Sequence, residues 1–112
     1  DTDNLNVVAF EKETMDKLGL IPEIAPRYRA TYFSHIIGGY AAGYYSYLWA
    51  EVLDTDAFEA FKEHGVFDKN TADSFRKNIL EKGGTEDPMT LYRGFRGADP
   101  SLEPLLKNRG LK

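Results

Sequence analysis

The sequence predicts an all-α fold, a compact set of several short helices. Apolar residues recur three, four and seven positions apart along most of the chain, which places them on one face of a helix. Asp, Asn, Pro and Gly stand where these segments begin and end, as is usual at helix termini. No stretch shows the alternation of a half-buried strand. With 112 residues, the chain is expected to form a single helical subdomain over residues 1–112.

The first predicted helix covers residues 4–18. Asp3 or Asn4 can cap its start, and Gly19 stands where a helix commonly stops. After it, Pro22 and Pro26 exclude a continuous helix. Residues 27–37 are ambiguous, because they are β-branched and aromatic but few, and they predict either a short helix or an extended piece. The helical spacing of the first segment is carried by Val7, Phe10, Met15 and Leu18.

A strong helix is predicted to begin at Tyr40 or Ala41. Asp54-Thr55-Asp56 predicts a restart with a new cap, after which a core face continues to Gly65. The residues sharing one stripe before this restart are Ala41, Tyr44, Tyr45, Leu48 and Val52. The aromatic residues expected in the core are Trp49, Phe58, Phe61, Phe75 and Phe95.

Three further helices are predicted in the last third of the chain. Asp68 begins one over residues 70–82, and Asp-Pro pairs at 87–88 and 99–100 begin the other two. The last helix is expected to end near Gly110. In the first of these helices, the residues expected to face the core are Ala72, Phe75, Ile79 and Leu80.

Composition excludes several classes of function. The net charge is −4 with both signs interspersed, so there is no electrostatic footprint for nucleic acid. Residues 31–50 carry no Asp, Glu, Lys or Arg, but five tyrosines make this stretch too polar for a membrane span. The absence of cysteine excludes a disulfide scaffold and a thiolate metal site. His35 and His64 are far apart and no H-E-x-x-H occurs, so no metal ligands are assigned within this chain.

The candidate site lies in residues 31–50, around His35, Tyr40 and Tyr47. In a helix Tyr40 and Tyr47 would share a face, with His35 just across the Gly38-Gly39 break. Hydroxyl and imidazole donors suit an oxyanion that develops during attack on a carbonyl group. The alternative is a tyrosine-packed core in which His35 is a hydrogen-bonded core residue. Arg27 and Arg29 are expected at the surface or in ion pairs, and binding of a substrate carboxylate stays open for them.

Residues 26–58 resemble the C-terminal signature of the thimet oligopeptidase and peptidyl-dipeptidase (dipeptidyl carboxypeptidase) family of zinc metallopeptidases. The most specific part is H-x-x-G-G-Y-x-x-x-Y-Y-x-Y-L-W, and the G-G-T-E-D-P-M and R-G-F-R-G-A-D-P runs extend the resemblance over essentially the whole chain. It implies a zincin-like, mostly helical body of two lobes around a deep channel. It also implies that His35, Tyr40 and Tyr47 contact the substrate and the tetrahedral intermediate. In the same way, Tyr44 is implied to line the cleft, and Gly38 and Gly39 to form a mobile substrate-binding loop.

The family's zinc-binding H-E-x-x-H helix and third Glu ligand are absent from this sequence. The resemblance therefore implies a C-terminal subdomain of a peptidase whose Zn²⁺ is bound elsewhere, with no zinc expected on this fragment and no activity alone. The parent enzyme is expected to be cytoplasmic, with a periplasmic location as the alternative. It is expected to hydrolyse oligopeptides by releasing C-terminal dipeptides, with cleavage within the peptide as the alternative. Self-association through an exposed apolar face is expected of the fragment. The competing prediction is a non-enzymatic helical module that docks a partner through its aromatic stripe.

Overall fold

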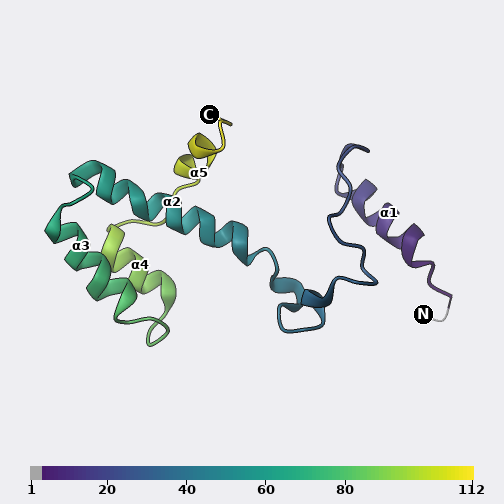
Figure 1. Ribbon diagram of the computed structural model, residues 1–112, viewed down its shortest axis with the longest axis horizontal. Helices are drawn as coiled ribbons and strands as arrows, with labels where there is room; N and C mark the ends of the chain where they lie inside the picture. The colour runs from purple at the N-terminus through teal and green to yellow at the C-terminus, as the bar shows by residue number, and fades with distance from the viewer. Residues whose placement is uncertain (1–3) are drawn as a thin grey trace. The chain divides into compact units, whose positions relative to one another are not determined.

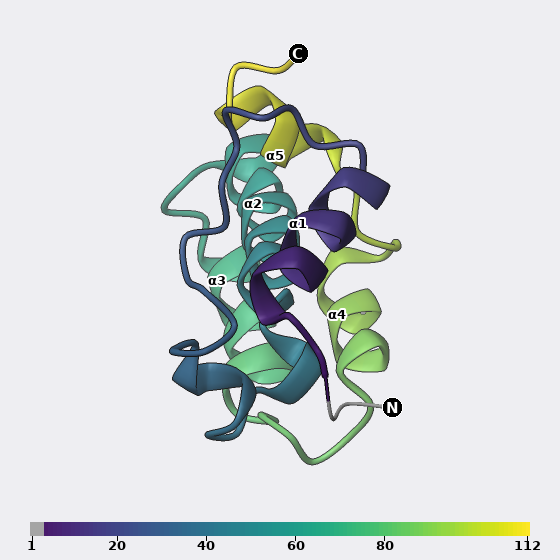
Figure 2. The same ribbon diagram turned by 90° about the vertical axis from the view of Figure 1, so that its right-hand side faces the viewer.

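The computed structural model describes residues 4–112 and contains helices and no strand within this range, which confirms the all-α prediction. The chain divides into two compact units, Asp1–Tyr44 and Tyr45–Lys112. The ribbon drawings in Figures 1 and 2 show the helices of each unit. Each unit is described by itself, and the expected single subdomain stays a prediction.

The first unit contains helix α1 (Val7–Lys17) and two short 3₁₀ turns, η1 (Ser34–Ile36) and η2 (Ala41–Gly43). The cap of α1 is Asn6, whose side chain accepts a hydrogen bond from the Ala9 amide at 3.1 Å. The predicted cap at Asn4 is therefore wrong, because a cap must lie immediately before the first helical residue. The other proposed cap, Asp3, lies outside the described residues. Gly19 follows the helix with φ 72°, as predicted for a helix end.

The second unit is built on helix α2 (Ser46–His64), and its start differs from the prediction. Gly39 has φ 124° and Ala41 has φ 47°, values that a right-handed helix does not use. A continuous helix from Tyr40 or Ala41 is therefore wrong. The predicted stripe from Ala41 to Val52 is divided between η2 and α2.

The predicted restart at residues 54–56 is also wrong, because α2 continues through them without a break. Thr55 and Asp56 are buried in the middle of the helix. The Thr55 hydroxyl donates to the Glu51 carbonyl at 2.7 Å, a bond within the helix that competes with capping. The helix ends at Gly65, which has φ 114°, as predicted.

Helix α3 (Lys69–Phe75) continues as a π-helical segment, η3 (Arg76–Leu80), and is followed by α4 (Pro88–Arg96) and α5 (Glu103–Asn108). The predicted caps of α3 and α4 are confirmed: Asp68 accepts from the Thr71 amide at 2.7 Å and Asp87 from the Thr90 amide at 2.8 Å. The predicted start of α5 at Asp99 is wrong. The Asp99 carboxylate instead accepts from Arg93 Nε at 2.6 Å, and α5 begins four residues later at Glu103.

The core of the second unit lies where α2 meets α4 and α5. Its buried members are Val52, Thr55, Asp56, Ala60, Leu91, Tyr92, Pro104 and Leu105. Phe61, Phe75 and Phe95 form a half-buried ring cluster beside them.

Trp49 and Phe58 are exposed at 45% and 46%, so their predicted core role is wrong. Phe58 lies six positions after the buried Val52, a spacing that places it on a different face of the helix. Trp49 lies in the first turn of α2, before the first buried residue of that helix. Ala72 and Leu80 are likewise exposed rather than inward.

Candidate functional site

Three of the predicted site residues form a closed ring cluster in the first unit. The His35 imidazole stacks on Tyr44, with centroids 5.3 Å apart and an interplanar angle of 24°. Tyr40 meets His35 edge-on at 5.1 Å and Tyr44 edge-on at 5.8 Å. Each of the three rings therefore contacts the other two, although they come from separate turns.

The Gly38-Gly39 turn brings Tyr40 back over His35. The Tyr40 amide donates to the His35 carbonyl at 3.0 Å, and the Gly38 amide donates to the Ser34 carbonyl at 2.8 Å. A Cβ at Gly38 would lie 3.1 Å from the Ser34 carbonyl oxygen, which is tighter than most side chains tolerate. Gly39 has φ 124°, a region that residues with a side chain rarely adopt. The turn therefore requires both glycines for a local steric reason.

Phe33 belongs to this cluster and was missed by the sequence reasoning. Its ring meets Tyr44 edge-on at 4.7 Å and His35 edge-on at 5.9 Å. Tyr28 stacks on the same Phe33 ring at 5.1 Å with an angle of 16°. The aromatic content of residues 28–33 is the available signal, but by itself it predicts only a short helix or an extended piece.

The cluster is open to solvent. His35 and Tyr40 are exposed, and Tyr44 and Phe33 are half-buried. The alternative in which His35 and Tyr40 belong to a tyrosine-packed core therefore does not hold for the first unit. A ligand could reach donor atoms of these side chains.

Tyr47 belongs to the second unit, where it lies in the first turn of α2 and is 57% exposed. The prediction that Tyr40 and Tyr47 share one helical face is wrong, because Tyr40 precedes η2 and α2 begins at Ser46. One turn beyond Tyr47, the Glu51 carboxylate accepts two hydrogen bonds from Arg109, at 3.1 and 2.5 Å. This pair connects the start of α2 to the end of α5.

The two arginines before the cluster differ in their partners. Arg29 donates to the Glu11 carboxylate on α1, and this hydrogen bond lowers the pKa of the Glu11 carboxyl group. The Ala30 amide also donates to Glu11, at 3.3 Å. The predicted ion pairing is therefore confirmed for Arg29. The Arg27 guanidinium lies over the Tyr28 ring, 5.2 Å from its centroid.

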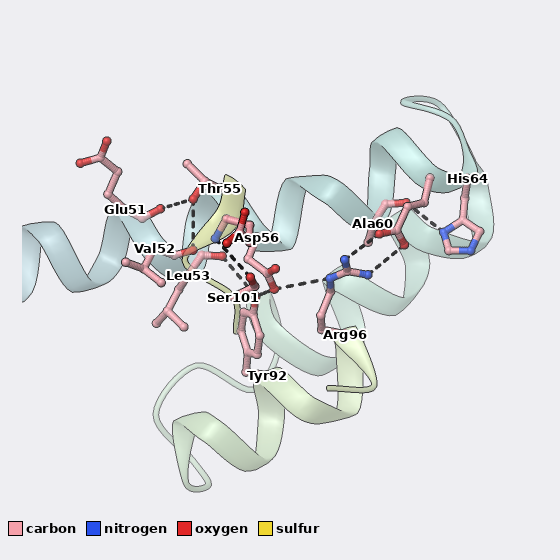
Figure 3. Close-up of polar contacts among 12 residues, drawn as sticks. Glu51, Val52, Leu53, Thr55, Asp56, Ala60, His64, Tyr92, Arg96 and Ser101 are labelled. Carbon is pink, nitrogen blue, oxygen red and sulfur yellow. Dashed lines mark hydrogen bonds and ion pairs between the residues drawn. The ribbon is translucent and has the colours of Figure 1, made fainter. Parts of the chain in front are cut away.

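The second unit contains a buried polar cluster, shown in Figure 3, that joins α2 to α4. Tyr92 Oη donates to Asp56 at 2.5 Å, and Arg96 Nε lies 3.5 Å from the same carboxylate. Arg96 also makes two hydrogen bonds to Glu63, at 2.9 and 2.7 Å. Burial, followed by the bond to Asp56, raises the pKa of the Tyr92 phenol well above its ordinary value. At the end of α2, the ring of His64 contacts the Ala60 carbonyl at 2.9 Å.

The described residues do not fit a metal ion. Within residues 4–112, no group of three or more His, Cys, Asp or Glu side chains is arranged to hold one. In the same range, no helix is both long and apolar enough to cross a membrane.

The sequence profile described as Peptidase family M3 matches residues 1–111. The chain belongs to this family. It is 57% identical over 81 residues to Oligopeptidase A of Escherichia coli (strain K12), which covers 71% of this chain and 12% of that protein. It is 45% identical over 112 residues to Dipeptidyl carboxypeptidase of the same organism, covering 99% of this chain and 16% of that protein. Probable cytosolic oligopeptidase A of Arabidopsis thaliana is 55% identical over 84 residues, covering 70% of this chain and 12% of that protein. The M3 chain thus spans only a small part of the length of these relatives.

Proposed function

We propose that this chain supplies the peptide-binding and oxyanion-stabilising segment of a zinc metallopeptidase that hydrolyses oligopeptides. Its membership of peptidase family M3 supports the reaction class, and its small share of its relatives' length supports a role as one part of a longer enzyme. The names of the relatives favour short peptides as substrates. Release of C-terminal dipeptides is the finer proposal, since the relative matched over 99% of this chain is a dipeptidyl carboxypeptidase.

The observation that carries the proposal is the exposed contact among His35, Tyr40 and Tyr44. Imidazole N–H and phenol O–H groups donate hydrogen bonds to carbonyl oxygens and to an oxyanion. Donors held in place before the substrate arrives need little reorganisation during the reaction, and each such donor is worth about 3–4 kcal/mol of barrier. In this proposal Tyr40 and His35 bind the peptide backbone and the developing oxyanion. Tyr44 lines the site and the Gly38-Gly39 turn closes over the peptide.

The metal of the proposed enzyme is Zn²⁺, bound by residues outside this chain, where it would activate the attacking water. The chain's own contribution is to bind, orient and donate. We expect the purified 112-residue chain to bind no stoichiometric zinc and to cleave no peptide. A zinc-to-protein ratio near one in metal analysis of this chain would contradict that expectation.

Tyr47 is the second proposed oxyanion donor, and its hydroxyl is the most direct test. In the longer enzyme, Tyr47→Phe should lower kcat by about one to three orders of magnitude, because a donor to the transition state is lost while the ring is kept. The matched control is Tyr45→Phe, which removes a hydroxyl from a 71% exposed neighbour that has no role in the proposal. Equal kcat values for Tyr47→Phe and Tyr45→Phe would refute the role of Tyr47.

A helical docking module remains the second candidate because α2 begins with exposed large apolar side chains. Tyr45, Leu48 and Trp49 are 71%, 51% and 45% exposed. A peptidase segment separated from its remaining lobe should self-associate through such a surface. A module should be a stable monomer that binds a peptide. Sedimentation of the chain, combined with calorimetry of peptide binding, distinguishes the two: self-association favours the peptidase segment, and a clean monomer that binds a peptide favours the module.

A further inference from the structure

We propose that Phe33 is a positioning residue, whose ring holds the His35 imidazole and the Tyr44 phenol in mutual contact. Phe33 touches neither a substrate nor a reacting atom in this proposal; it acts through the two rings that it contacts. Its consequence for catalysis rests on the proposed peptidase function. Its consequence for the geometry of the cluster can be tested on this chain alone.

Phe33 contacts both of the site rings that it is proposed to position. Its ring meets Tyr44 with centroids 4.7 Å apart and an interplanar angle of 85°. It meets His35 at 5.9 Å and 80°, so both site rings approach Phe33 nearly edge to face. This is a favoured geometry for aromatic pairs.

Tyr28 also contacts Phe33, stacking on its ring at 5.1 Å. The Arg27 guanidinium lies over the Tyr28 ring in turn, and Tyr32 meets Tyr28 edge-on at 6.3 Å. Phe33 is half-buried, whereas its chain neighbours Tyr32 and Ser34 are exposed. Phe33 therefore contacts Tyr28 as well as the two site rings.

The backbone around His35 gives a reason why such support is needed. His35 lies in η1, a single 3₁₀ turn, and Phe33 precedes this turn without a side-chain cap bond. A single 3₁₀ turn is less regular and less firmly bonded than an α-helix, so it constrains side-chain directions weakly. On this backbone, contact with other rings has to determine the direction of the imidazole. Tyr40 and Tyr44 are themselves on short turns, and Phe33 contributes a further ring, on which Tyr28 stacks.

The geometric arm of the test uses the intact 112-residue chain and proton NMR. The sequence has two histidines, so the ring protons of His35 are read against those of His64, which lies in α2 of the other unit. In the unsubstituted chain we expect nuclear Overhauser contacts between the His35 and Tyr44 rings. Phe33→Leu should weaken these contacts or remove them, while the His64 signals stay in place. Phe33→Tyr should keep them, because the ring is retained.

Two controls separate positioning from general loosening. Phe58→Leu makes the same chemical change at an exposed ring in the second unit and should leave the His35–Tyr44 contacts unchanged. Amide contacts within α1 report whether the first unit stays folded in Phe33→Leu. If α1 is lost in Phe33→Leu, the substitution Tyr28→Leu is used in its place. Tyr28→Leu removes the ring that stacks on Phe33 and leaves Phe33, His35 and Tyr44 unchanged. It should also weaken the contact between His35 and Tyr44. His35–Tyr44 contacts that persist at full strength in the folded variant would overturn the proposal.

The catalytic arm uses the longer enzyme. A misplacement of binding groups by about 1 Å can cost about 100-fold in rate, so we expect Phe33→Leu to lower kcat/KM by roughly 10- to 100-fold. Phe33→Tyr should restore most of the activity, which a purely space-filling role would not require. An enzyme that hydrolyses no peptide before any substitution counts against the proposed function alone, since the NMR arm still decides the role of Phe33. Loss of the His35–Tyr44 contacts together with unchanged kcat/KM overturns the catalytic part.

Discussion

The two units of the chain use their polar and aromatic side chains in opposite ways. The second unit places Asp56, Tyr92 and Leu105 inside, with Asp56 and Tyr92 bonded to each other. In the first unit, no residue of the described range 4–44 is buried, and its rings meet at the surface. Burying a polar group costs free energy unless the group is hydrogen-bonded. The buried polar residues of the second unit therefore contribute to its folding rather than to ligand binding. Exposed donors held by ring contacts are what a ligand can use.

The comparison also separates how the two units should respond to mutation. Loss of one partner in the second unit leaves other polar groups buried without water. Loss of one ring in the first unit leaves its neighbours solvated, and the effect falls on geometry rather than on folding. Substitutions in the buried core of the second unit should therefore change the free energy of unfolding. Substitutions at exposed site residues, in the ring cluster of the first unit and at Tyr47 of α2, should change binding and rate.

The largest effect on stability is expected from Asp56→Ala. This change removes the acceptor of the Tyr92 hydroxyl and the carboxylate 3.5 Å from Arg96 Nε, an atom that is buried and has no hydrogen-bond partner. The Tyr92 hydroxyl is then buried without its acceptor and the Arg96 guanidinium loses the carboxylate beside it, at an expected cost of about 3 kcal/mol in the free energy of unfolding of the second unit. Urea denaturation followed by circular dichroism measures this cost.

The matched control is Asp54→Ala, at an exposed position of the same helix. It makes the same chemical change and should leave the urea midpoint almost unchanged, as surface substitutions usually do. If Asp54→Ala and Asp56→Ala shift the midpoint equally, the second unit does not depend on its buried polar cluster, and the contrast between the two units fails.

Sequence reasoning succeeded where a local signal decides the structure. Asp68 and Asp87 were recognised as caps because a side chain three residues before an amide forms a bond that depends on no distant contact. The same signal failed at Asp56, because its partner Tyr92 lies 36 positions away in the sequence. A buried carboxylate and a capping carboxylate look alike until the fold brings their partners together.

The candidate site divides in the same way. The Gly38-Gly39 turn could be foreseen from the residues, and the resemblance to known peptidases implied roles for His35 and Tyr40. The contact of Phe33 with Tyr44 could not be foreseen, because it depends on two turns of unpredicted geometry. The positive φ of Ala41 is the clearest case: alanine favours helix, and nothing in the sequence around it predicts a left-handed backbone at this position.

A smaller effect is expected from alkaline pH acting on Tyr92. Burial and the bond to Asp56 raise the pKa of its phenol in the folded state above the ordinary value of about 10. Above pH 10 the unfolded chain loses this proton while the folded chain keeps it, so the stability that the raised pKa represents is lost as the pH rises. Tyr92→Phe should cost about 1–2 kcal/mol at pH 7 through the lost hydrogen bond.

The measurement compares the free energy of unfolding at pH 9 and pH 11 for the unsubstituted chain and for Tyr92→Phe. Other tyrosines and lysines titrate in both proteins, so the difference between the two slopes reports Tyr92. We expect the unsubstituted chain to lose more stability over this interval. Parallel slopes would mean that the phenol is not held protonated by the fold.

The smallest effect is expected at Glu51, whose carboxylate pairs with Arg109 at the surface of the second unit. The hydrogen bond from Arg109 lowers the pKa of the Glu51 carboxyl group, so any stabilisation is present above the ordinary pKa of glutamate and is lost as the pH falls through the lowered value. Exposed pairs contribute little, because water screens them and two long side chains must be ordered. Glu51→Gln should therefore leave the urea midpoint at neutral pH close to that of the unsubstituted chain. A shift as large as that of Asp56→Ala would mean that α5 is held on α2 by this surface pair rather than by its buried Pro104 and Leu105.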